Sequence, residues 1–200
     1  MPGKGRLEIK EAIREDARDL ACLINLAGEG IPEYLWRDMA ETGESSMDVG
    51  EKRAARESGS FSYTNARICA ENNILLGMML SYRQDDPYDA GDLSACPDLV
   101  RPLIELEAQA PGSWYINAIA TYEQYRGRGV ARQLMMDAEI QARLAGCKLI
   151  SLVVASENIT AKRLYENTGF NVVASLPVVL YPGCLYGGSW MLMTKFLVNE

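Results

Sequence analysis

The sequence predicts a mixed α/β fold in one domain spanning residues 1–200. Segments with the apolar pattern of strands and segments with apolar residues at helical spacing follow one another in the order β-α-α-β-β-insertion-β-α-β-α-β-β. The chain has 200 residues, of which 48% are hydrophobic and 24% charged. This is ordinary for a globular protein that buries a core.

The first part of the chain predicts a strand and two helices. Residues 6–13 alternate apolar and polar side chains, which is typical of an edge strand. Asp16 is a candidate N-cap for a helix over 17–27, and Gly28 is its stop signal. A second helix is expected over 31–40, because a proline fits its first turn.

A helix and a hairpin are expected next. Residues 48–57 are charged and form a candidate helix. Two apolar segments, 64–71 and 74–83, flank Asn72-Asn73, and asparagine tolerates the left-handed conformation of a tight turn.

Residues 84–112 read as an insertion that resembles a lid. The segment is rich in Asp, Gly and Pro and holds one short helix over 101–109. An amphipathic helix needs a surface on which to pack, so this is more than a linker.

The last part of the chain alternates strands and helices. A helix over 129–145 has an apolar stripe and ends at Gly146. Residues 148–155 are almost continuously apolar, as in a strand covered on both faces. The other elements expected here are strands at 113–121, 170–176 and 189–197 and a helix at 158–167.

Composition excludes several classes of function. The chain has no histidine, so it cannot form a Ser-His-Asp triad, a Cys-His pair or a histidine-bearing metal site. The net charge of −7 argues against binding nucleic acid or an anionic membrane and suits a cationic partner.

Cysteines and terminal signals indicate a cytoplasmic protein. The five cysteines lack C-x-x-C spacing, and several lie in apolar segments, which favours buried thiols over metal or disulfide use. The amino terminus leads into a charged segment rather than a secretory signal, and no apolar stretch reaches the ~20 residues of a membrane span.

The segment 121–131 carries the strongest functional signal. It links a strand to a long helix and contains Arg126, Gly127, Arg128 and Gly129. Glycines leave the backbone amides accessible, a helix start supplies further N–H groups, and arginines add positive charge. Together they predict a site for a pyrophosphate.

Other interpretations of this loop are a plain tight turn and a dinucleotide-binding fragment. No Gly-Lys-Ser/Thr follows, so it is not an NTP-binding P-loop. The third glycine of a Rossmann fingerprint is absent, because Arg132 stands in its place.

At two motifs the sequence resembles the GNAT family of acetyl-CoA-dependent N-acetyltransferases. Arg126, Gly129 and Ala131 match the Gln/Arg-x-x-Gly-x-Gly/Ala hallmark. About thirty residues later, Asn158 and the segment 164–170 (LYENTGF) match the family's Asn…Leu-Tyr-x-x-x-Gly-Phe segment. The stretches 31–36 and 101–114 resemble a bacterial subgroup of the family whose acceptors are undefined.

The resemblance implies a GNAT-type fold. This is a mixed, mostly antiparallel, twisted sheet of about seven strands with flanking helices. The strands 114–121 and 148–155 are expected to splay apart at the acyl-CoA cleft. Acetyl-CoA is the expected cosubstrate, with no metal. Its expected contacts are Ile119, Ala120, Thr121, Arg126, Gly127, Arg128, Gly129, Val130, Ala131, Asn158 and Tyr165.

The implied reaction is direct attack of a primary amine on the thioester. Proximity and a backbone N–H near Ile119 or Ala120 assist the attack, and Tyr165 is the candidate acid for the leaving thiolate. Without histidine, a glutamate is the expected base, directly or through water. The candidates are Glu33, Glu105 and Glu107, each of which could instead be a solvated helix charge, as Tyr165 could be a core residue.

Two departures from the family pattern bear on the acceptor. Tyr122-Glu123 replaces the proline usual after the strand, and the 84–112 insertion replaces a short connection. The acceptor could be a small molecule or a protein amine. The main alternative from another class is a non-catalytic acyl-CoA-binding or sensor module. The sequence does not determine the oligomeric state, and exposed edge strands are compatible with a homodimer.

Overall fold

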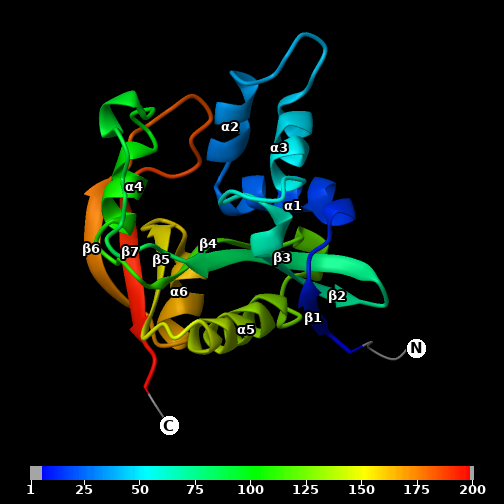
Figure 1. Ribbon diagram of the computed structural model, residues 1–200, viewed down its shortest axis with the longest axis vertical. Helices are drawn as coiled ribbons and strands as arrows, with labels where there is room; N and C mark the ends of the chain where they lie inside the picture. The colour runs from blue at the N-terminus through cyan, green and yellow to red at the C-terminus, as the bar shows by residue number, and fades with distance from the viewer. Residues whose placement is uncertain (1–5, 199–200) are drawn as a thin grey trace. The chain divides into compact units, whose positions relative to one another are not determined.

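The computed structural model describes residues 6–198 and arranges their strands in one seven-stranded sheet of order β1-β2-β3-β4-β5-β7-β6 (Figure 1). Strand β4 pairs in parallel with β5, and the pairs β1–β2, β2–β3, β5–β7 and β6–β7 are antiparallel. The predicted mixed, mostly antiparallel fold is confirmed. The strands are β1 (Glu8–Glu11), β2 (Ala66–Glu71), β3 (Ile74–Arg83), β4 (Trp114–Thr121), β5 (Leu149–Ala155), β6 (Asn171–Pro177) and β7 (Ser189–Phe196).

Helices follow the predicted order. They are α1 (Ala17–Ala27), α2 (Ile31–Arg37), α3 (Ser46–Ala54), α4 (Arg101–Glu107), α5 (Val130–Leu144) and α6 (Ile159–Asn167). Short 3-10 turns are η1 (Arg14–Asp16), η2 (Tyr63–Asn65), η3 (Leu93–Ala95) and η4 (Glu123–Tyr125). Among the helices of residues 6–198, none has the length and apolar character needed to cross a membrane.

The chain forms two compact units. Unit 1 holds the described residues up to Ser81 together with Ala118–Asp137, and unit 2 holds Tyr82–Asn117 and the described residues from Ala138 onward. Strands β3 and β4 and helix α5 contribute to both units. That one domain spans the whole chain stays a prediction.

The core of unit 1 lies between its helices and its strands. Side chains of α1, among them Leu20 and Ile24, are fully buried in one cluster with Ile68 of β2 and Leu80 of β3. Helices α1, α2 and α3 lie together above these strands in Figure 1.

Helix α2 packs closely on α3 because position 50 is a glycine. A Cβ on Gly50 would lie 2.3 Å from the ring of Trp36, which is itself buried. The missing side chain therefore makes room for the indole, and a larger residue would force the two helices apart.

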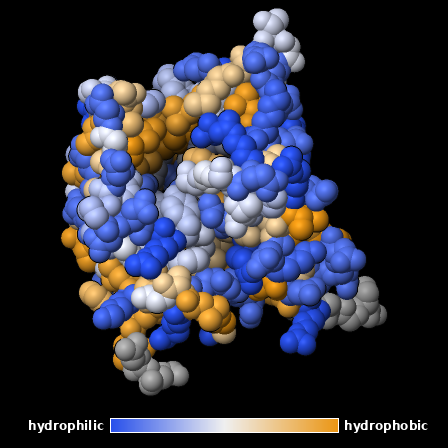
Figure 2. Space-filling view, viewed as in Figure 1, coloured by the Kyte–Doolittle hydropathy of each residue, from blue (hydrophilic) through white to orange (hydrophobic). Residues whose placement is uncertain are grey.

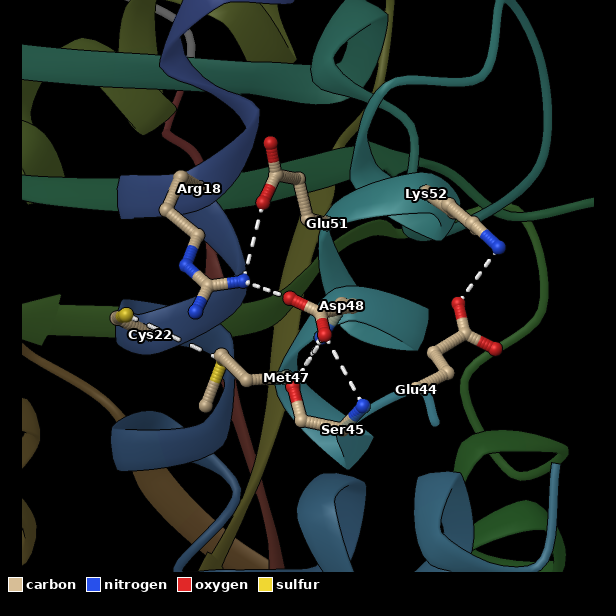
Figure 3. A network of polar contacts seen from close by, with 8 residues as sticks. All are labelled: Arg18, Cys22, Glu44, Ser45, Met47, Asp48, Glu51 and Lys52. Atoms are coloured by element: carbon tan, nitrogen blue, oxygen red, sulfur yellow. Dashed lines mark hydrogen bonds and ion pairs between the residues drawn. The ribbon is translucent and has the colours of Figure 1, made fainter. Parts of the chain in front are cut away.

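A polar network joins α1 to α3 (Figure 3). Arg18 of α1 pairs with Asp48 at 2.7 Å and with Glu51 at 3.0 Å. Asp48 also closes a capping box, because it accepts from the N–H and the hydroxyl of Ser45, whose Oγ in turn accepts from the Asp48 N–H. The charged segment predicted over 48–57 is therefore a helix that begins two residues earlier.

Helix α1 begins and ends at the predicted residues, but the residues that flank it act differently from their sequence signals. Asp16 occupies the N-cap position without a side-chain hydrogen bond to α1; its carboxylate accepts from the N–H of Ile13 at 2.9 Å, at the start of η1. Gly28 follows α1 as expected but has a negative φ, and the left-handed residues are Glu29 and Gly30. Gly28 is needed for space instead, because a Cβ there would lie 2.6 Å from Pro32 Cδ.

The β2–β3 hairpin has the predicted turn. Asn72 and Asn73 both adopt positive φ, 51° and 63°. Two successive left-handed residues match the twist of the flanking strands, as in a type I′ turn.

Unit 2 is built on β5, β6 and β7. Helix α4 packs on these three strands, and its Leu106 is fully buried. The 84–112 insertion is thus fixed on the sheet, as its amphipathic helix predicted. Figure 2 shows apolar surface beside α4, where the loop joining β6 to β7 lies in Figure 1; that loop exposes Leu180 and Leu185.

We expect the stability of unit 1 to depend on the charge of Asp48. The hydrogen bonds from Ser45, followed by that from Arg18, lower the pKa of Asp48 to about 2. A depressed carboxylate pKa adds stability above its unfolded value of about 4, and that stability is lost as the pH falls through 2. Asp48→Asn should therefore lower the urea midpoint at pH 7.

Urea titrations at several pH values measure this effect. The difference between Asp48→Asn and the wild type should shrink toward pH 2, where the wild-type carboxylate is protonated too. Asp38→Asn, at an exposed aspartate after α2, is the control for loss of one charge. A constant difference at all pH values would contradict this account of the capping box.

Candidate functional site

The loop between β4 and α5 in unit 1 has the geometry of an anion site. Gly127 and Gly129 adopt φ of 73° and 86°, and α5 begins at the next residue, Val130. The first four N–H groups of a helix have no partner within it, so the amides near Val130 point out of the helix start. These groups and the positive end of the helix dipole favour a negatively charged ligand.

Charge and exposure at the loop agree with this geometry. The first turn of α5 contains no acidic residue, and Arg132 in that turn is exposed. Residues 126–129 are exposed as well. A Cβ built on Gly127 or on Gly129 would meet nothing within 4 Å, so the space in front of both glycines is open.

Close approach of β3 fixes the position of this loop. A Cβ on Gly77 would lie 2.6 Å from the carbonyl oxygen of Ala120 and 2.9 Å from Cγ1 of Val130. The N–H of Tyr122 also donates to the carbonyl oxygen of Leu76 at 2.9 Å. The absence of a side chain at residue 77 therefore lets β3 hold both the end of β4 and the start of α5.

Arg128 is already engaged within unit 1. Its guanidinium pairs with Glu71 at 2.6 Å and lies 5.8 Å from the ring centroid of Tyr125. A phosphate bound at the loop would share Arg128 with Glu71. That Arg126 and Arg128 contact a diphosphate stays a prediction.

The β4 residues expected beside the pantetheine arm lead into this loop. Ala120 is buried, whereas Ile119 and Thr121 keep part of their surface. Earlier in β4, Trp114, Tyr115 and Ile116 pair with Ile150, Ser151 and Leu152 of β5. The splaying of the two strands beyond these pairs stays a prediction.

Tyr165 and Asn158 lie on α6 of unit 2. Asn158 is the N-cap, and its side-chain oxygen accepts from the N–H of Ala161 at 3.2 Å. Tyr165 is buried, and its ring centroid lies 6.1 Å from that of Phe170. Tyr165 thus packs in the core as its apolar position indicated, and its proposed role toward the thiolate stays a prediction.

The three candidate glutamates have different surroundings. Glu33 of α2 accepts from the side-chain amide of Asn25 at 3.2 Å and pairs with Arg37 at 3.3 Å. Glu105 of α4 is exposed. Glu107 accepts from the hydroxyl of Tyr115 at 2.8 Å and from that of Tyr88 at 3.0 Å.

Glu107 has the most unusual environment of the three. Burial raises its pKa, and the hydrogen bonds from Tyr115 and Tyr88 act in the opposite direction. Burial, followed by the nearby Glu107 charge, raises the pKa of Tyr88 and of Tyr115, so both phenols stay protonated donors at neutral pH.

Sequence reasoning missed the tyrosines around Glu107. Tyr82 packs edge-on against Tyr115, with ring centroids 6.0 Å apart, and its hydroxyl accepts from the side-chain amide of Asn117 at 2.9 Å. The sequence signal was a tyrosine near the end of β3, another near the start of β4 and a third, Tyr88, inside the insertion between them. Sequence reasoning also missed Glu29, which is buried and adopts φ of 57°.

No metal centre is built from the part of the chain that the structure describes, residues 6–198. There, no group of three or more Cys, Asp or Glu side chains is placed to hold an ion. All five cysteines are free thiols.

The sequence also matches a known family model. The model of the acetyltransferase (GNAT) family aligns with residues 29–170, which is more than half of the chain and includes the glycine loop and both motifs. The chain belongs to the acetyltransferase (GNAT) family. The predicted family is thereby confirmed.

A curated relative agrees with this membership. The uncharacterized N-acetyltransferase YycN of Bacillus subtilis is 43% identical over 56 residues, which cover 28% of this chain and 36% of that protein. The chain therefore aligns with about a third of the length of this relative.

Two solved structures share the fold. The polyamine N-acetyltransferase of Drosophila melanogaster has a TM-score of 0.66 at 13% identity, covering 96% of this chain and 100% of that one. The yncA protein of Salmonella typhimurium, solved with its cofactor acetyl-CoA, has a TM-score of 0.60 at 16% identity, covering 97% and 95%.

Two glycine variants separate the effect of backbone strain from the effect on ligand binding at the loop of residues 126–131. Gly129 and Gly146 both have left-handed φ, 86° and 71°, and at both a Cβ would meet open space. Valine at either position should cost about 1–2 kcal/mol of stability. Only Gly129→Val should also lower the affinity for CoA, by at least about tenfold, because its side chain fills the loop.

Thermal melting and calorimetric titration with CoA provide the two measurements. Gly146→Val, at the far end of α5, is the matched control and should keep wild-type affinity. Equal CoA affinity in Gly129→Val and the wild type would exclude the loop as the phosphate site.

Proposed function

We propose that this protein transfers an acetyl group from acetyl-CoA to a primary amine by direct attack. The observation that carries the proposal is the loop of residues 126–131, with two left-handed glycines, open space before them and a helix start behind. Membership in the acetyltransferase (GNAT) family and the acetyl-CoA bound in yncA support it.

The loop holds the diphosphate of the donor in this proposal. Backbone amides of residues 126–131 donate hydrogen bonds to phosphate oxygens, and Arg126 adds positive charge. Arg128 contributes while keeping its contact with Glu71. The backbone of Ile119, Ala120 and Thr121 pairs with the pantetheine arm, and Asn158 adds a contact to it.

Three features of the chain assist the chemistry. Binding holds the amine and the thioester in the orientation for reaction, so the attack takes place within one complex and needs no bimolecular encounter. A backbone N–H of Ile119 or Ala120 donates to the carbonyl oxygen as negative charge develops there. Tyr165 gives its phenolic proton to the leaving thiolate.

The acceptor arrives protonated and must lose a proton first. Glu33, Glu105 and Glu107 are the proposed bases, acting directly or through water. Exposed Glu105 can pass a proton to solvent, whereas Glu33 is held by Asn25 and Arg37. The acceptor is a small-molecule or protein amine, and the net charge of −7 favours a cationic one. We place the protein in the cytoplasm, as monomer or homodimer.

Release of free thiol from acetyl-CoA in the presence of an amine panel tests the proposed activity. We expect amine-dependent thiol release and acetylated product. Tight binding of acetyl-CoA without turnover on any amine would support a sensor module instead. Binding of NAD without binding of CoA would support a dinucleotide site.

Tyr165→Phe tests the proposed acid. The variant keeps the ring that packs on Phe170 and removes only the hydroxyl. Turnover should fall by about 10²- to 10⁴-fold, whereas CoA affinity should change little. Tyr63→Phe, at a tyrosine that contacts Glu57 in unit 1, is the matched control and should keep wild-type turnover. Unchanged turnover in Tyr165→Phe would assign Tyr165 to packing alone.

A further inference from the structure

A partly buried carboxylate in unit 2, that of Glu107, accepts its side-chain hydrogen bonds from neutral groups. The two oxygens of Glu107 accept one hydrogen bond each, from Tyr115 and Tyr88. No arginine or lysine of residues 6–198 forms an ion pair with Glu107. Buried carboxylates are usually paired with a cation, so this charge lacks its ordinary partner.

The position of Glu107 is also unfavourable for helix stability. It is the last residue of α4, where the negative end of the helix dipole repels a carboxylate. The exposed Asp89 of the insertion adds to the negative potential that acts on Tyr88. An apolar residue would pack there at lower cost.

Glu107 has capacity for a ligand. An ionised carboxylate has about four lone-pair sites, and the two phenols use two of them. Glu107 and Tyr88 each keep part of their surface exposed. Two acceptor sites of the carboxylate are therefore not used by the phenols.

Two tyrosines contact this carboxylate through their hydroxyls, and a third packs on one of them. Tyr82 packs edge-on against Tyr115, and its proximity adds to the rise in pKa of both Tyr88 and Tyr115. Tyrosine faces attract ammonium groups through the ring quadrupole. A carboxylate and several tyrosines together suit a primary ammonium.

The insertion is anchored firmly enough to hold this arrangement. Its two ends pair with each other, because the N–H of Gln84 donates to the Ser113 carbonyl at 2.9 Å and that of Gly112 donates to the Asp85 carbonyl at 3.1 Å. The hydroxyl of Ser113 further contacts that of Ser151 of β5 at 2.6 Å. Tyr88 is thereby kept against Glu107.

We propose that Glu107, with Tyr82 and Tyr88, binds a second cationic group of the acceptor, one that stays protonated while another amine is acetylated. Tyr88 and Tyr115 act as positioning residues for the carboxylate. The proposal rests on the function proposed above and gives Glu107 a binding role in place of the role of base.

A group that stays charged fits better than the reacting nitrogen. A carboxylate next to an ammonium favours its protonated form, which cannot attack the thioester. The reacting amine must lose its proton, whereas a second ammonium keeps its charge throughout. Glu107 therefore determines which acceptor binds.

Two matched pairs of acceptors test this role. In each pair, one acceptor carries the second cation and the other has a neutral group of similar size. The first pair is 1,4-diaminobutane and 4-aminobutan-1-ol. The second is a peptide with lysine after its amino-terminal residue and the same peptide with norleucine there, which tells a peptide acceptor from a small one.

In the wild type, kcat/KM should be higher for the cationic member of at least one pair. Glu107→Gln should lower that value by about 10- to 100-fold, the usual effect of removing a hydrogen bond to a charged group. The loss should lie in KM, and the neutral member should be unaffected. Tyr88→Phe should act in the same direction with a smaller effect. Asp98→Asn, at an exposed carboxylate of the same insertion, should leave both pairs unchanged.

CoA affinity and melting temperature, measured for each variant, show whether it is folded. Equal kcat/KM within both pairs, or a preference that survives in Glu107→Gln, would overturn the proposal while the proposed function stands. If the wild type acetylates no amine, the proposed function fails. Calorimetric binding of 1,4-diaminobutane to the wild type and to Glu107→Gln then tests the subsite by itself: binding lost in the variant supports it, and no binding to the wild type overturns it.

Discussion

Unit 1 depends on one close backbone approach. At Gly77 the strand β3 comes so near to the end of β4 and the start of α5 that no Cβ fits between them. The loop with Gly127 and Gly129 is anchored at both of its ends by this contact. Its amides can then stay exposed without a lining of side chains, because rigidity comes from the strands behind. An anion site made of backbone needs such support, since backbone groups cannot change rotamer to follow a ligand.

Local patterns in the sequence predicted the order of elements and the glycine loop. The hairpin at Asn72-Asn73, the continuous apolar strand around Leu152 and the helix start at Val130 each depend on a few neighbouring residues. These features can be predicted because turn chemistry and apolar periodicity act within one element and do not depend on tertiary contacts. The ends of α1 were predicted at the right residues, but the roles of Asp16 and Gly28 were not, because both make contacts with residues outside that helix.

The environment of each candidate side chain could not be predicted in the same way. Glu33, Glu105 and Glu107 look alike in the sequence, yet one is ion-paired, one is exposed and one is held by phenols. That difference comes from tertiary contacts, in which the insertion folds back on the sheet and brings Tyr88 to Glu107, 19 residues further along the chain. Sequence spacing carries no information on such an encounter. The need for Gly77 was invisible for the same reason.

The contact between Arg128 and Glu71 has a consequence for how fast the proposed enzyme can work. Every catalytic cycle ends with departure of the spent carrier, and departure is slow when each cation in the site is committed to the ligand. If the loop holds phosphates as proposed, Glu71 competes with them for Arg128, because the two side chains already form an ion pair. The proposed loop would then bind its product less tightly and release it sooner.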